Sequence, residues 1–167
     1  MRFYLLLIIS FSLLLTGCGS MKSQPKSTLA QIQSMQTRQF HVSKRKLYEA
    51  VIQVFQDNGF VIKHSDYETG FMTAKGLSKS DDYGLFGDIV DSILWGSAGD
   101  DDSVHTTYTV CSALMTPIHA NTTQVRINCV GVRKTSIGDG IGETDSQVKS
   151  PKAYEHLFNK IKTKLIR

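Results

Sequence analysis

The side chains best suited to metal or acid–base chemistry are spread along the chain without the spacing of a known site. No His-x-x-x-His or Glu-x-x-His pair occurs among the five histidines, which are His41, His64, His105, His119 and His156. A zinc site needs three or four ligands, commonly with short spacings between pairs of them. Histidines from distant segments would have to converge, so we predict no metal site. We expect His41 and His64 to lie on adjacent strands instead.

Two further patterns suggest ligand sites but lack the required spacing. Residues 100–102 are three aspartates, with more at 81–82 and 88, but they lack the alternating ligands ending in Glu of an EF-hand. Residues 138–143 read G-x-G-x-G rather than the G-x-G-x-x-G of a dinucleotide loop, and their two acidic residues would repel phosphate. We interpret the first as a solvated acidic loop and the second as a flexible loop, and we predict no cofactor.

The N-terminus has the features of an export signal. Arg2 gives a basic start, and residues 3–15 are almost wholly apolar, which is typical of a secretory signal peptide. The apolar run is too short to span a bilayer comfortably, since a spanning helix needs about 20 apolar residues. Leu15-Thr16-Gly17-Cys18 then resembles the lipobox of bacterial lipoproteins, in which an aliphatic residue, a small residue and Gly or Ala precede Cys.

This resemblance implies that residues 1–17 are removed, that the Cys18 thiol receives a diacylglycerol and that the new amine is acylated. Several acyl chains hold a protein stably, because each buried methylene contributes about 0.8 kcal/mol. Residue 19 is Gly rather than the Asp that tends to retain enterobacterial lipoproteins in the inner membrane, so the resemblance favours the outer membrane of a Gram-negative cell. Residues 18–37, rich in Ser, Gln, Lys and Thr, are typical of a flexible tether.

Composition limits the remaining chain to one domain, which we place at residues 38–167. Only Arg2 is charged among the first 17 residues, so the mature net charge is one unit below the +4 of the whole sequence. This mild excess and an envelope location argue against nucleic acid as a partner. With Cys18 lipidated, Cys111 and Cys129 remain as a pair in a compartment that permits disulfides.

Periodicity predicts an α+β domain in the order β-α-β-β-[α]-β-β-α. Strands are indicated at 38–42, 60–65, 71–75, 104–115 and 123–133, helices at 44–56 and from Ser150-Pro151 onward, and a loop at 135–149. Ser43 is a suitable N-cap, and Asn58-Gly59 tolerates the left-handed angles that end a helix. The order predicts an antiparallel sheet with helices packed on one face.

The turn at residues 117–121 sets a register for the longest hairpin. With Ala120 at its centre, three apolar pairs face each other and share the core face: Met115 with Val125, Ala113 with Ile127, and Cys111 with Cys129. Directly opposed strand residues lie within the separation that disulfides accept. We therefore favour a disulfide over two buried thiols, and over Cys111 as a nucleophile.

The insertion at residues 76–102 contains an apolar repeat of three- and four-residue spacing, which predicts a short amphipathic helix. Packing of this helix on the sheet is one interpretation, and an exposed surface for a partner or the membrane is the other. The candidate contact residues are Phe86, Ile89, Val90, Ile93, Leu94 and Trp95.

Several segments from Arg38 to the end resemble a family of small, largely uncharacterised bacterial outer-membrane lipoproteins. They are Arg38-Gln39-Phe40, the stretch from Ala50 to Phe60, Glu68-Thr69-Gly70, Thr73-Ala74-Lys75 and Pro151-Lys152-Ala153-Tyr154 with Leu157-Phe158. The strand–helix–strand plan is more distantly similar to the helix-grip domains of the lipoprotein C subunit of the outer-membrane β-barrel assembly machinery. Both resemblances concern fold and compartment, and neither supplies a catalytic residue.

Taken together, these patterns predict a non-enzymatic lipoprotein that faces the periplasm from the outer membrane. It would be an accessory or scaffold subunit of a cell-envelope complex, attached to the membrane through lipid on Cys18 and contacting an envelope protein. The alternative is a periplasmic module that binds a lipid or small ligand in a groove between the sheet and its helices.

Overall fold

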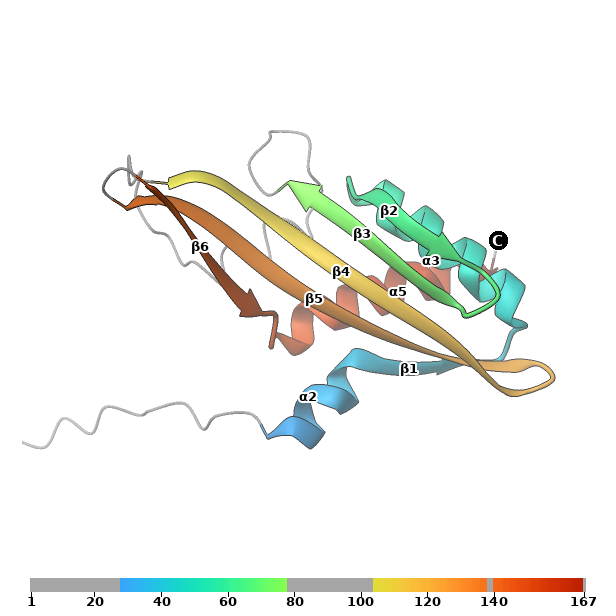
Figure 1. Ribbon diagram of the computed structural model, residues 1–167. Helices are drawn as coiled ribbons and strands as arrows, with labels where there is room; N and C mark the ends of the chain where they lie inside the picture. Colours follow the sequence, from blue (N-terminus) through green and yellow to red (C-terminus); the bar gives the residue numbers. More distant parts are fainter. Residues whose placement is uncertain (1–27, 78–103, 138–139, 167) are drawn as a thin grey trace, which may run out of the picture.

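A computed structural model describes residues 28–77, 104–137 and 140–166. Its described strands form one antiparallel sheet in the order β1-β5-β4-β3-β2, and β6 also pairs with β5 (Figure 1). β1 pairs with residues 123–126 of β5 and β6 with residues 130–137, so the two follow one another along the same edge. The strands are β1 (Thr37–Phe40), β2 (Val61–Asp66), β3 (Phe71–Leu77), β4 (Val104–His119), β5 (Thr122–Ile137) and β6 (Gly140–Gln147).

The helices α3 (Lys44–Asp57) and α5 (Pro151–Ile166) lie on the same side of the sheet (Figure 1). Each presents an apolar stripe to the alternate, inward-facing residues of the central strands, as amphipathic helices do. Fully buried members of this core include Leu47 and Phe55 of α3, Leu157 and Ile161 of α5, and Met72 of β3. The predicted α+β architecture, with an antiparallel sheet and helices on one face, is confirmed.

The long hairpin has the predicted register. Met115 pairs with Val125, Ala113 with Ile127 and Cys111 with Cys129, and all six side chains are buried. Cys111 and Cys129 form a disulfide, with Cα atoms 4.1 Å apart. The cross-link therefore joins the two central strands in the middle of the core.

The residues predicted to cap and end α3 lie at its two ends. The Ser43 hydroxyl accepts a hydrogen bond from the Lys46 N–H at the start of α3, and Gly59, with φ +77°, follows the end of that helix. The turn between β2 and β3 closes at Gly70, with φ +75°, whose carbonyl accepts the Met115 N–H at 2.9 Å. A Cβ at Gly70 would collide with the Met115 carbonyl, so only glycine fits this approach of the turn to β4.

Three predicted boundaries were wrong. Residues 29–36, placed in the tether, form the helix α2 (Leu29–Gln36), because Thr28 and Gln31 make a capping box and Ile32 is buried. Residues 140–147, predicted as loop, form β6, because the free edge of β5 satisfies their backbone groups. The insertion begins no earlier than residue 78, since residues 76–77 complete β3.

The expectation that His41 and His64 lie on adjacent strands was also wrong. His41 directly follows β1, whereas His64 lies in β2, and these strands stand at opposite edges of the sheet. The reason is that the two strands of the long hairpin have different outer neighbours, because β4 pairs with β3 and β5 pairs with β1. Three strands therefore separate the two histidines.

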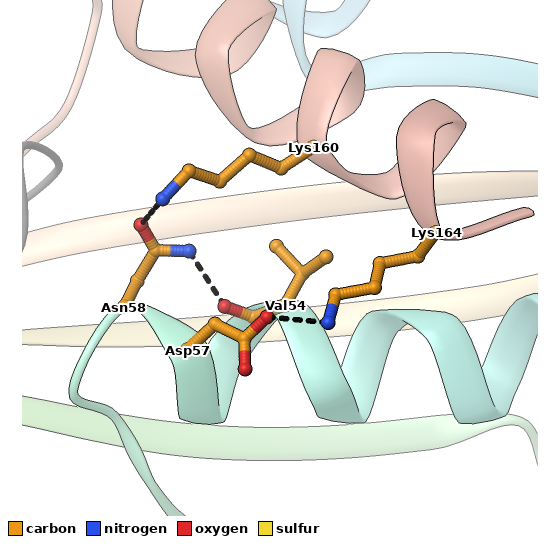
Figure 2. Close-up of polar contacts among 5 residues, drawn as sticks. All are labelled: Val54, Asp57, Asn58, Lys160 and Lys164. Atoms are coloured by element: carbon orange, nitrogen blue, oxygen red, sulfur yellow. Dashed lines mark hydrogen bonds and ion pairs between the residues drawn. The ribbon is translucent and has the colours of Figure 1, made fainter. Parts of the chain in front are cut away.

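Hydrogen bonds and an ion pair connect the C-terminal end of α3 to α5 (Figure 2). The Asn58 side chain donates to the Val54 carbonyl at 2.6 Å and accepts from the Lys160 Nζ at 2.8 Å. The Lys164 Nζ lies 2.7 Å from an Asp57 carboxylate oxygen. Both lysines approach the C-terminal end of α3, where the helix dipole favours positive charge.

These two neighbouring contacts should differ in their contribution to stability. Asn58 is buried, so Asn58→Ala removes the oxygen that the Lys160 ammonium binds and one of two Asn58 donors to the Val54 carbonyl, and it should cost about 1–2 kcal/mol. The Asp57 side chain is 49% exposed, so Asp57→Ala should cost at most about 1 kcal/mol. Urea unfolding of the two variants measures both values, and an equal loss would show that burial does not decide the difference.

Candidate binding groove

A groove of about 440 Å³ runs between β1 and the C-terminal half of α5. Its volume lies in the range of pockets that hold small molecules. Most of the lining is apolar and comes from Phe40 and Val42 on one side and from Phe158, Leu165 and Ile166 on the other. The polar lining residues are Arg38, Gln39, His41, Asn159 and Lys162.

Pairing with β5 fixes the strand side of the groove. Arg38 and Phe40 lie opposite Val125 and Thr123, so their side chains share the face that carries the helices. Just beyond the strand, the Val42 carbonyl accepts a hydrogen bond from the Thr123 hydroxyl at 2.9 Å. The lining residues 38–42 are therefore held against β5 even though β1 itself is short.

The helix side of the groove is fixed by the core. Phe158 and Leu165 are buried on the stripe of α5 that packs against the sheet, whereas Ile166 is 77% exposed. The Arg38 guanidinium lies 5.3 Å from the centre of the Phe158 ring, which is cation–π distance. This contact connects the two sides of the groove.

The charged residues that line the groove are all basic. Arg38 and Lys162 are exposed, and no carboxylate lies among the lining residues. Within the described part of the chain, neither cation forms an ion pair with Asp or Glu. The Arg38 guanidinium donates one hydrogen bond, to the Thr37 carbonyl at 3.3 Å. The remaining donors of its planar fork are available to a carboxylate or phosphate.

A buried polar cluster connects α2, β5 and α5 close to the start of β1. The Tyr154 hydroxyl accepts from the Cys129 N–H at 3.2 Å and from Gln36 Nε2 at 3.3 Å, and it donates to the Val148 carbonyl at 3.1 Å. Gln36 Nε2 also donates to Asn128 Oδ1 at 2.9 Å. Burial raises the pKa of Tyr154 above its ordinary value, so the phenol stays protonated and can donate. Because Gln36 directly precedes β1, the cluster fixes where that strand begins.

The structure does not gather the described histidines into one site. His41, His64 and His119 are exposed at different places, and His156 is partly buried on α5. Burial, and after it the Lys160 cation, lower the pKa of His156 below its ordinary value. No group of three or more His, Cys, Asp or Glu residues in the described ranges is placed to hold a metal ion.

The other sequence-predicted site residues have different outcomes. Cys111 and Cys129 meet in the disulfide. Cys18 lies outside the described residues, as do the candidate contacts Phe86, Ile89, Val90, Ile93, Leu94 and Trp95. Sequence reasoning missed the residues of the groove, although it predicted the strand at 38–42 and the helix that begins at Ser150-Pro151. The available signal was the excess of basic over acidic residues in those two segments.

Comparison with known proteins adds no relative: no protein-family model matches the chain, and no curated protein matches it significantly. Among the helices described, none has both the length and the apolar character needed to cross a membrane.

Proposed function

We propose that the protein is a membrane-anchored, non-enzymatic module of the cell envelope that binds a lipid or small apolar ligand in the groove between β1 and α5. The observation that carries the proposal is the groove itself, an apolar cavity of about 440 Å³ bordered by basic residues. An apolar pocket with a few convergent polar groups is the usual form of a small-molecule site.

The anchoring part of the proposal rests on sequence. Leu15-Thr16-Gly17-Cys18 supports lipid attachment at Cys18 after removal of residues 1–17, and Gly19 favours the outer membrane with the domain in the periplasm. The non-enzymatic part rests on the sequence as well, because its His, Asp and Cys residues do not have the spacing of a known catalytic site.

A photo-crosslinking amino acid at Ile166 tests the groove in living cells. Ile166 borders the groove and is 77% exposed, so it should give an adduct with the ligand. The matched control is Ile141 on β6, which is 69% exposed and does not line the groove. Mass spectrometry of the two purified proteins should find a lipid or small-molecule adduct at position 166 and none at position 141.

The same experiment examines the other candidate function, an accessory or scaffold subunit of an envelope complex. A specific envelope protein crosslinked at position 166, and lost when Cys18→Ala removes the anchor, would favour a subunit of a complex over a ligand-binding module. The apolar repeat from Phe86 to Trp95 supports such a partner surface from sequence alone. Equal adducts at positions 166 and 141 would contradict any specific role for the groove.

A further inference from the structure

We infer that the occupant of the groove is an anionic membrane phospholipid, with an acyl chain against the apolar lining and the phosphate at Arg38 and Lys162. The inference rests on the proposed function and names the ligand class.

The lining suits an acyl chain. Phe40, Val42, Phe158 and Leu165 supply an apolar surface. None of the residues that line the groove has a buried polar side-chain atom that lacks a hydrogen-bond partner. A chain laid along these residues is stabilised by the hydrophobic effect for each methylene that leaves water. The exposed Ile166 extends the apolar surface to the outside of the molecule.

The charge suits a phosphate. Arg38 and Lys162 stand on opposite sides of the groove, one on β1 and one on α5, and no carboxylate lining the groove offsets them. The Arg38 fork can bind two phosphate oxygens at once, whereas a lysine ammonium acts as a point charge. A zwitterionic headgroup would bring a cation to the same place and gain less.

The distance suits a ligand drawn from the bilayer. If Cys18 is anchored as proposed, about ten residues separate it from the first described residue, Thr28, and a fully extended chain of that length spans at most roughly 35 Å. β1 follows immediately after α2, so the strand side of the groove is close to the anchor in sequence, and the α5 side is brought to it by the fold. The bilayer surface is therefore the closest source of an anionic amphiphile.

Photo-crosslinking from the lipid tests this ligand directly. The full-length protein is placed in phosphatidylcholine vesicles that contain a trace of phosphatidylglycerol with a photoactivatable acyl chain. Parallel samples carry the same chain on phosphatidylcholine or as a free fatty acid. Peptide mapping should find the phosphatidylglycerol probe on residues 38–42 and 158–166, and clearly less of the other two probes there.

A matched pair of charge reversals on one helix isolates the headgroup contact. Lys162→Glu should reduce groove labelling by phosphatidylglycerol at least about fivefold, since it replaces an attraction between ammonium and phosphate with a repulsion between carboxylate and phosphate. Lys152→Glu makes the same change of net charge at an exposed residue of α5 that does not line the groove, and it should leave labelling unchanged.

The possible failures are distinguishable. Equal groove labelling by the three probes, insensitive to Lys162→Glu, would overturn the anionic phospholipid and leave an apolar groove ligand standing. Groove labelling by the fatty acid alone would overturn the phospholipid as the source. Labelling no stronger in the groove than on β6 overturns the inference, and an unlabelled Ile166 in cells would then remove the proposed function too.

Discussion

Replacing both Cys111 and Cys129 with alanine is expected to lower the free energy of unfolding by about 3 kcal/mol, because the disulfide restricts the unfolded chain by closing a loop. The two cysteines are 18 residues apart in sequence, so the cross-link removes many conformations of the hairpin that the unfolded chain would otherwise sample. Guanidinium unfolding of the oxidised wild type and of the double variant, both full length, measures the difference.

A reductant provides the control for this prediction. Both cysteines are fully buried, so a thiol reagent should act on the wild type mainly when it unfolds. Unfolding in the presence of reductant should therefore move the wild type toward the double variant and leave the double variant unchanged. A wild type whose unfolding midpoint does not depend on reductant would contradict a stabilising disulfide.

The hairpin that carries this disulfide could be predicted because local and long-range signals agreed. A turn at Pro117 to Asn121 fixed the centre, and alternation placed three apolar pairs on one face. A register shift of one residue would have turned all of them to solvent, so the pattern left a single solution. The cap at Ser43 was predictable for a similar reason, since a capping side chain acts within three residues of its own position.

The missed elements depended on contacts between distant segments. The residues of β6 include Gly140 and Gly142 and lack strong alternation, and it is pairing with the free edge of β5 that orders them. The helix α2 is weakly amphipathic in sequence. It ends at Gln36, whose partners Asn128 and Tyr154 lie 92 and 118 residues away along the chain.

The groove was beyond sequence reasoning for the same physical reason. Its two sides come from residues 38–42 and 158–166, and each segment alone has the ordinary pattern of a strand or an amphipathic helix. Only the packing of α5 across the sheet leaves Phe40 and Val42 half-buried beside Phe158. Of the sequence-derived sites, the cysteine pair is present in the structure, while Cys18 and the apolar repeat at 86–95 remain predictions.

Tyr154→Phe is expected to lower the free energy of unfolding by about 2–4 kcal/mol, although it removes a single oxygen atom. The hydroxyl is buried and makes three hydrogen bonds. Its loss therefore leaves the Cys129 N–H and the Val148 carbonyl without this partner inside the protein. Gln36 keeps its bond to Asn128 but loses its contact with α5. Denaturant unfolding gives the free energy, and faster hydrogen exchange of the Cys129 amide would place the defect in the middle of β5.

Tyr108→Phe is the matched control, because it removes a hydroxyl that faces Glu143 on the exposed side of the sheet, at 3.2 Å. Water replaces that partner, so the loss should stay within about 0.5 kcal/mol. Equal, small losses in both variants would mean that water also replaces the Tyr154 hydroxyl, and that the cluster does not hold β1 and α5 together. A large loss confined to Tyr154→Phe would instead show that the buried cluster stabilises the fold, since Gln36 directly precedes β1 and Tyr154 belongs to α5.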